Sequence, residues 1–165
     1  MRLYLLRHAS ASDVAPSDAE RQLTKEGEEE SRIAGAALAE LGVQPAHIFS
    51  SPLVRARQTA QIAAKELKFS GDLGTLDELL NDTPTSSLLK ALKSFDITSE
   101  LLLIGHVPSL SEHLASVVGA KNPAGFPFGK GSLACIELKQ LRVGSGQLRW
   151  FMRQKQLRLV AHRRA

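Results

Sequence analysis

The sequence of 165 residues has a single cysteine, Cys135, so it excludes a disulfide framework within the chain. It has no run of 18 apolar residues, so we expect no membrane-spanning helix. Its first apolar segment, "MRLYLLRHAS", is interrupted by an arginine, is too short for a signal-peptide core and precedes no small-residue cleavage site. Together these absences predict a protein of the cytoplasm.

Several catalytic signatures are also missing. No G-x-x-x-x-G-K-[ST] loop is present, which argues against hydrolysis of nucleoside triphosphates by that route, and no G-x-S-x-G elbow is present for a serine hydrolase. Cys135 lies in an apolar segment, and no arginine follows it at the spacing of a cysteine phosphatase loop. His106 and His113 have no evident third partner for zinc. We therefore expect neither a metal nor another cofactor.

Acidic residues are absent after Glu137, although the net charge of the whole chain is only +4. This basic segment predicts either a solvated edge or a patch that steers an acidic or phosphorylated substrate. Only Trp150 and Phe151 interleave with its cations, so we expect no nucleic-acid partner. The cations are Lys139, Arg142, Arg149, Arg153, Lys155, Arg158, Arg163 and Arg164.

Short apolar runs alternate with longer segments of helical period. The pattern predicts strands at 2–6, 47–51, 100–106, 132–138 and 146–152, a strand and turn within 74–80, and a further strand at 156–160. It predicts helices from the N-cap Thr24 to 41, and at 52–67, 88–95 and 108–118. This order predicts one α/β domain over residues 1–165, with helices on a mixed, mostly parallel central sheet.

Three predicted strand ends carry groups that suit a phosphate, at the edge where open α/β sheets bind ligands. The first strand ends in Arg7 and His8, the strand at 100–106 ends in His106, and Arg55 lies one turn into the helix after segment 47–51. Guanidinium groups grip phosphoryl oxygens in pairs, and a neutral imidazole, with a pKa of about 6.5, is a competent nucleophile. The sequence therefore predicts that His8 accepts a phosphoryl group.

Three motifs in series, "LLRHAS", "SSPLVRARQTA" and "LLLIGHVPSL", resemble the phosphoglycerate-mutase-like histidine phosphatase superfamily over nearly the whole chain. The resemblance implies a three-layer α/β/α sandwich. It also implies that His8 becomes phosphorylated and that Arg7, Arg55 and His106 form the phosphate pocket.

The short chain and the segment "ASDVAPSDAERQLTKEGEEESR" resemble the SixA-type phosphohistidine phosphatases within that superfamily. This resemblance implies that Arg21 reaches the phosphate pocket. One position departs from the family pattern, because Ala9 stands where a glycine is usual. The added methyl group matters only where the backbone needs a positive φ.

The general acid is left open between three carboxylates. Larger members of the family use a glutamate after the third strand, and Glu78 takes the matching position; Asp82 and Asp18 are the alternatives. The same carboxylate would activate the water that releases phosphate from His8. A phosphohistidine substrate needs little help from an acid, because imidazole is a good leaving group.

The substrate is predicted from the size of the chain. About thirty residues separate Phe69 from Glu100, which leaves little material for a lid, and an open site suits a phosphorylated side chain on a protein. We expect a monomer that dephosphorylates histidine-containing phosphotransfer proteins. The alternatives are a phosphomonoesterase for small metabolites and, given Ala9, a weakly active phosphate-binding module.

Overall fold

The computed structural model describes residues 1–162, and its strands form one six-stranded sheet in the order β3-β2-β4-β1-β5-β6. The strands are β1 (Arg2–Arg7), β2 (His47–Ser50), β3 (Leu73–Thr75), β4 (Glu100–Gly105), β5 (Leu133–Leu138) and β6 (Gly146–Met152). Strands β1 to β4 run parallel to one another, whereas β5 runs antiparallel to β1, and β6 to β5. The mixed, mostly parallel sheet is confirmed.

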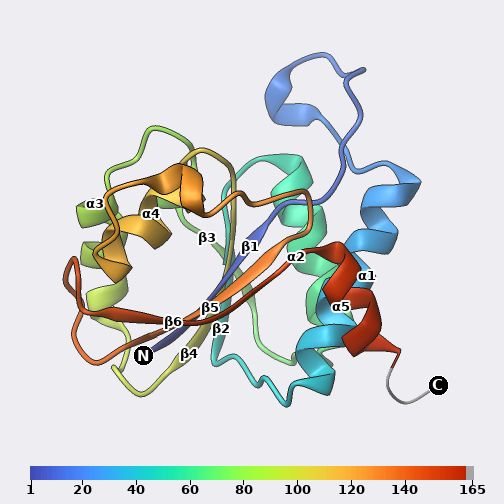
Figure 1. Ribbon diagram of the computed structural model, residues 1–165. Helices are drawn as coiled ribbons and strands as arrows, with labels where there is room; N and C mark the ends of the chain where they lie inside the picture. Colours follow the sequence, from blue (N-terminus) through green and yellow to red (C-terminus); the bar gives the residue numbers. More distant parts are fainter. Residues whose placement is uncertain (163–165) are drawn as a thin grey trace.

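Helices cover both faces of this sheet (Figure 1). They are α1 (Lys25–Glu40), α2 (Val54–Glu66), α3 (Thr85–Ala91), α4 (Ser109–Val118) and α5 (Gln154–Ala161). Short 3-10 helices lie between them: η1 (Asp18–Glu20), η2 (Asp77–Leu79), η3 (Leu92–Ser94) and η4 (Pro123–Gly125). Helices α1, α2 and α5 lie on one face, and α3 and α4 on the other, which confirms the three-layer sandwich.

Alternate residues of the central strands feed two hydrophobic cores. In β1, Tyr4 and Leu6 pack toward α1 and α2, while Leu3 and Leu5 pack toward α3 and α4. Period-two alternation places successive side chains on opposite faces, so a strand covered on both faces reads as one apolar run. This explains why "RLYLL" and "ELLLI" lack polar residues in their interiors. The cores hold the carboxyl ends of β1 and β4 rigidly beside each other.

The predicted strand at 156–160 is wrong, because these residues belong to helix α5. Leu157 is fully buried, and Val160 and Ala161 pack with it against the core shared with α1. These positions follow the i, i+3, i+4 spacing of one helix face. The alternation of "QLRLV" imitated a strand over too few residues to reveal that spacing.

The other helices follow the predictions, with shifted ends. Thr24 is the N-cap of α1, and its hydroxyl accepts a hydrogen bond from the amide of Gly27 at 3.1 Å. The third helix begins at Thr85, directly after Pro84, and continues as η3, rather than starting at 88. Within residues 1–162, none of the helices combines the length and apolar character needed to cross a membrane.

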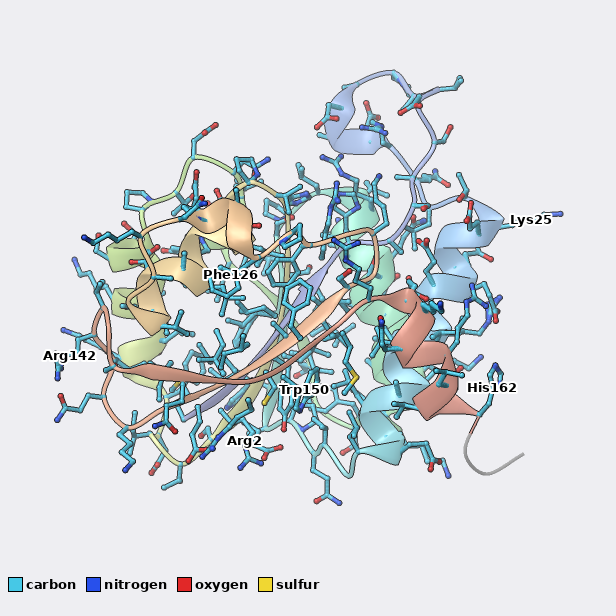
Figure 2. All side chains as sticks on the ribbon, in the orientation of Figure 1. Arg2, Lys25, Phe126, Arg142, Trp150 and His162 are labelled. Atoms are coloured by element: carbon cyan, nitrogen blue, oxygen red, sulfur yellow. The ribbon has the colours of Figure 1, made fainter. Side chains whose placement is uncertain are left out.

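Among residues 1–162, the basic residues after Glu137 are spread over separate parts of the surface. Arg142, in the turn between β5 and β6, lies on the opposite side of the molecule from His162 at the end of α5 (Figure 2). Arg149 forms an ion pair with Glu137. The dispersed arrangement favours the solvated edge over a single steering surface; Arg163 and Arg164 lie outside the described residues.

Candidate active site

The two catalytic histidine candidates are brought together by strand pairing. Arg7 is paired with Gly105 across β1 and β4, so the next residues, His8 and His106, emerge side by side. Their ring centroids lie 4.8 Å apart. Pairing of Ser50 with Ile104 brings the following Ser51 to the same edge. In Figure 1 this is the upper edge of the sheet, below the projecting segment between β1 and α1.

Both ring nitrogens of His8 have defined partners. Nδ1 donates to the carbonyl of Ala9 at 2.8 Å, while Nε2 accepts from Nε of Arg55 at 3.3 Å. These contacts select the tautomer with its proton on Nδ1 and its lone pair on Nε2. Burial lowers the pKa of His8 to about 3, with smaller contributions from the neighbouring charges of His106, Lys130 and Arg55. The ring is therefore neutral at pH 7, as a nucleophile must be.

His106 is buried against the start of the second helix. Its Nε2 is hydrogen-bonded to the hydroxyl of Ser51 at 2.6 Å, and its Nδ1 is buried without a protein partner. Burial, followed by the charge of Arg55, lowers its pKa to about 4. An anion bound beside the ring would favour the protonated form, which donates hydrogen bonds from both nitrogens.

Arg55 is buried at the second position of α2, and its guanidinium links the nucleophile to the segment between β1 and α1. Besides its contact with His8, it donates to the carbonyl of Asp18 at 2.7 Å and to the Asp18 carboxylate at 3.1 Å. The planar fork is thus oriented on two sides. It holds a fixed positive charge next to His8.

Arg7 presents a second guanidinium from the last residue of β1. One terminal nitrogen donates to the carbonyl of Phe128 at 2.8 Å, and its Nε is buried without a protein partner. Burial lowers its pKa, while the nearby charge of Glu30 partly restores it. Buried donors without partners are uncommon and are typical of functional sites. The guanidinium has donors available for an oxyanion.

Arg21 lies at the rim of the pocket, held by its own loop. It forms ion pairs with Asp13 at 2.5 Å and Asp18 at 3.3 Å, and its Nε donates to the carbonyl of Ser12. The same Asp18 carboxylate contacts Arg55, so Arg21 is connected to the pocket through Asp18. Hydrogen bonds from Arg55 and Arg21 lower the pKa of Asp18, which favours its ionised form and disfavours a role as proton donor.

The other two acid candidates, Glu78 and Asp82, lie in the segment between β3 and α3. Glu78 is half-buried in η2, next to Leu79, whose carbonyl packs against Gly105 at the end of β4. Within residues 1–162, no hydrogen bond or ion pair joins the Glu78 carboxylate to the histidines or to Arg55. Asp82 is exposed and lies in a turn, where its amide donates to the hydroxyl of Ser109. The identity of the acid stays a prediction.

Ala9 occupies its position without backbone strain. Lys68 and Asp82 are the non-glycine residues with positive φ in the described chain, and Ala9 is not among them. Its amide donates to the hydroxyl of Thr59 at 3.2 Å, and its side chain is fully buried. The missing glycine therefore does not distort the segment that carries His8.

One cation in this environment was not among the predicted site residues. Lys130 is half-buried in the segment that leads into β5, and partial burial lowers its pKa, as do the charges of Arg7, Arg21 and Arg55. The sequence showed only a lysine between two glycines in a Gly/Pro-rich loop. Its place depends on the pairing of β5 with β1, which the sequence did not specify.

An apolar cavity of about 530 Å³ adjoins the histidine side of the pocket. Val107 and Pro108, which follow His106, form one wall, and Phe126 and Phe128 form part of the other. Phe126 is labelled in Figure 2, on the segment between α4 and β5. Separately, no group of three or more His, Cys, Asp or Glu side chains among residues 1–162 is arranged to hold a metal ion.

Known proteins are similar to this chain in sequence and in fold. Residues 3–81 match the histidine phosphatase superfamily (branch 1). An uncharacterized protein of Picosynechococcus sp. is 36% identical over 120 residues, which cover 68% of this chain and 70% of that protein. Phosphohistidine phosphatase SixA of Escherichia coli is 29% identical over 158 residues, which cover 92% of this chain and 93% of that protein.

Comparison of the fold with solved structures also identifies SixA as similar to this chain. A solved structure of the protein histidine phosphatase SixA, complexed with tungstate, aligns with a TM-score of 0.87 at 26% sequence identity. The alignment covers 95% of this chain and 99% of the other. The motifs, the sheet order and these similarities agree, and the chain belongs to the histidine phosphatase superfamily, in which it is similar to the SixA proteins.

Proposed function

We propose that the protein is a phosphohistidine phosphatase that acts on histidine-containing phosphotransfer proteins through a phosphorylated His8. The observation that carries this proposal is the Nε2 lone pair of a neutral His8 beside the guanidinium of Arg55, with Arg7 and His106 on the same sheet edge. Superfamily membership supports phosphatase activity. The similar SixA structure holds tungstate, a tetrahedral oxyanion like phosphate.

In the first step, Nε2 of His8 attacks phosphorus in line with the bond to the leaving nitrogen. The new N–P bond forms as the old one breaks, and the electron pair returns to the leaving imidazole of the substrate, which takes up a proton from the proposed general acid, Glu78, or from solvent. The hydrogen bond from Nε of Arg55 to Nε2 of His8 is long, at 3.3 Å. Nε of Arg55 can therefore readily donate to a phosphoryl oxygen instead. Arg7 and Arg55 then balance the charge on the phosphoryl oxygens.

In the second step, water attacks the phosphorus carried by His8. The N–P bond breaks, its electron pair returns to Nε2, and a proton from water passes to a nearby base; Glu78 is the proposed base. The bond from Nδ1 to the carbonyl of Ala9 holds the ring in place through both steps. This proposed reaction proceeds without a metal, because guanidinium groups and His106 supply the positive charge.

The small amount of chain available to form a lid over the site favours a protein substrate. Residues between α2 and β4 form β3, η2, α3 and η3, and their apolar side chains, including Leu79, Leu88 and Leu92, are buried in the core on the α4 face. Little of this segment is left to close over the pocket. A phosphohistidine on the surface of a phosphotransfer protein can then approach His8; we place the enzyme, as a monomer, in the cytoplasm with such proteins.

A small phosphate ester is the second candidate, favoured by the apolar cavity beside His106. Its volume of about 530 Å³ is in the range of small-ligand pockets. An ester with an aromatic or aliphatic group could place that group against Phe126 and Phe128. No observation favours the weakly active binding module, because Ala9 is unstrained.

The test compares a phosphorylated phosphotransfer domain with a panel of aromatic and aliphatic phosphate esters. We expect release of phosphate from the phosphotransfer domain, and an acid-labile, alkali-stable phosphoryl label on the wild-type enzyme. The His8→Ala variant should lose both, whereas His162→Ala, an exposed control, should keep both. Fast turnover of esters alone would replace the proposed substrate, and full activity of His8→Ala would disprove the mechanism.

A further inference from the structure

The segment Gly129–Lys130–Gly131 lies directly against the backbone of the nucleophile. The amide of Gly131 approaches the carbonyl of His8 at 3.4 Å, and the amide of Arg7 donates to the carbonyl of Ser132 at 3.0 Å. These contacts continue the antiparallel pairing of β1 with β5 beyond the end of β1. Lys130 is therefore attached to a backbone that lies beside His8.

The turn that carries Lys130 is fixed on its other side by helix α5. Gly131 has a φ of 63°, and a side chain there would overlap the amide of Gln154. Nε2 of Gln154 donates to the carbonyl of Gly131 at 2.9 Å and to the carbonyl of Glu30 at 3.0 Å. Positive φ and close approach explain the glycine at 131. The turn is held between α1, α5 and the nucleophile strand.

The ammonium group of Lys130 lies near other positive charges, and among residues 1–162 it has no hydrogen-bond or ion-pair partner. Within residues 1–162, no carboxylate forms an ion pair with it. Burial lowers the pKa of Lys130, the charges of Arg7, Arg21 and Arg55 lower it further, and the charge of Glu30 opposes them. The Glu30 carboxylate already accepts the amide of Ser10 at 2.7 Å. A half-buried cation in such surroundings is stabilised by a bound anion.

We propose that Lys130 is a phosphate-binding residue of this pocket, whose ammonium group contacts an oxygen of the phosphoryl group held beside His8. The inference rests on the proposed function for the identity of its substrate, but not for the binding of phosphate itself. Lys130 adds a positive charge from the last third of the chain to those of Arg7 and Arg55. Because a lysine binds as a mobile point charge, it can stay with the phosphoryl group as it moves from substrate to His8.

The test measures binding of inorganic phosphate to the whole protein by calorimetry. Lys130→Met should weaken binding about tenfold or more, since a hydrogen bond to a charged group contributes at least that factor. Lys130→Arg should restore binding to within about threefold, which a purely structural role for the side chain would not require. Lys139→Met, which changes an exposed lysine in the β5–β6 turn, should bind as the wild type does.

The outcomes separate this inference from the proposed function. Binding by a folded Lys130→Met within twofold of wild type would overturn it, and so would a wild type that does not bind phosphate. If the variant binds phosphate weakly but the wild type does not hydrolyse phosphohistidine, Lys130 keeps its role and the proposed function fails. If phosphohistidine is hydrolysed and Lys130→Met changes neither the binding of phosphate nor KM, the proposed function stands and the role of Lys130 fails.

Discussion

The ring planes of His8 and His106 are inclined to each other by 50°. Each histidine directly follows one member of the pair Arg7–Gly105, which joins the two central strands β1 and β4. The pair Arg7 and Gly105 fixes this relationship through the backbone ladder. The geometry of the two histidines therefore depends on the middle of the sheet rather than on the surrounding loops. The strands that precede the two histidines are packed on both faces against the hydrophobic cores.

The first prediction concerns protonation. Burial lowers the pKa of His8 to about 3 and that of His106 to about 4, against about 6.5 in an unfolded chain. Both rings should therefore stay neutral as the pH of the ligand-free protein falls from 8 to 5. The chemical shifts of their ring nitrogens in two-dimensional ¹H–¹⁵N spectra should not change over this range. Added phosphate should raise both pKa values, because an anion favours the imidazolium. A ligand-free ring that titrates near pH 6.5 would contradict this.

A second prediction separates charge from geometry at Arg55. Arg55→Lys keeps the positive charge but cannot contact His8, the main-chain carbonyl of Asp18 and the Asp18 carboxylate at once. We expect kcat/KM to fall by about 100-fold, the typical effect of losing a preorganised donor. Arg57→Lys, an exposed change on the same helix, should stay within about twofold. Near-normal activity of Arg55→Lys would show that charge alone suffices.

A third prediction concerns Gly27, in the first turn of α1. Replacing a helical glycine with alanine ordinarily stabilises a protein by about 1 kcal/mol. Here the new methyl group would overlap the carbonyl of Ser10, in the segment that follows His8. Gly27→Ala should instead lower both the free energy of unfolding in urea and kcat/KM. Gly125→Ala has open space around it and is the control; equal stability of the two variants would refute the close contact.

The fourth prediction concerns Ala9→Gly, which restores the residue usual in the family. The methyl group is buried and the backbone does not need a positive φ, so the change should cost about 1 kcal/mol of stability. We expect kcat/KM to change by less than about threefold. A large increase in activity, measured with the phosphorylated phosphotransfer domain, would mean that Ala9 does restrain the nucleophile.

Much of the fold was predictable because its signals are local. The strands that carry His8 and His106 are apolar runs buried on both faces, and Thr24 marks the start of a helix. Segment 156–160 misled because its spacing fits a strand and a helix equally well over five residues. Only the packing of Leu157 against the α1 core decides between them.

The site was predictable where its residues follow strands in short motifs. The tautomer of His8 was not, since it depends on the carbonyl of Ala9 and on Arg55, which meet only in three dimensions. Lys130 was not among the predicted residues because its position depends on a long-range strand pairing. The acid stays open for the same kind of reason, since within residues 1–162 no hydrogen bond or ion pair connects the Glu78 carboxylate to His8, His106 or Arg55.

The pairing of β5 with β1 determines the stage of chain synthesis at which the pocket can be completed. A chain synthesised only as far as α4 would already contain His8, Arg55 and His106. It would still lack the Phe128 carbonyl that holds Arg7 and the turn that abuts the His8 backbone. The pocket is therefore completed only after β5 has been synthesised and has paired with β1.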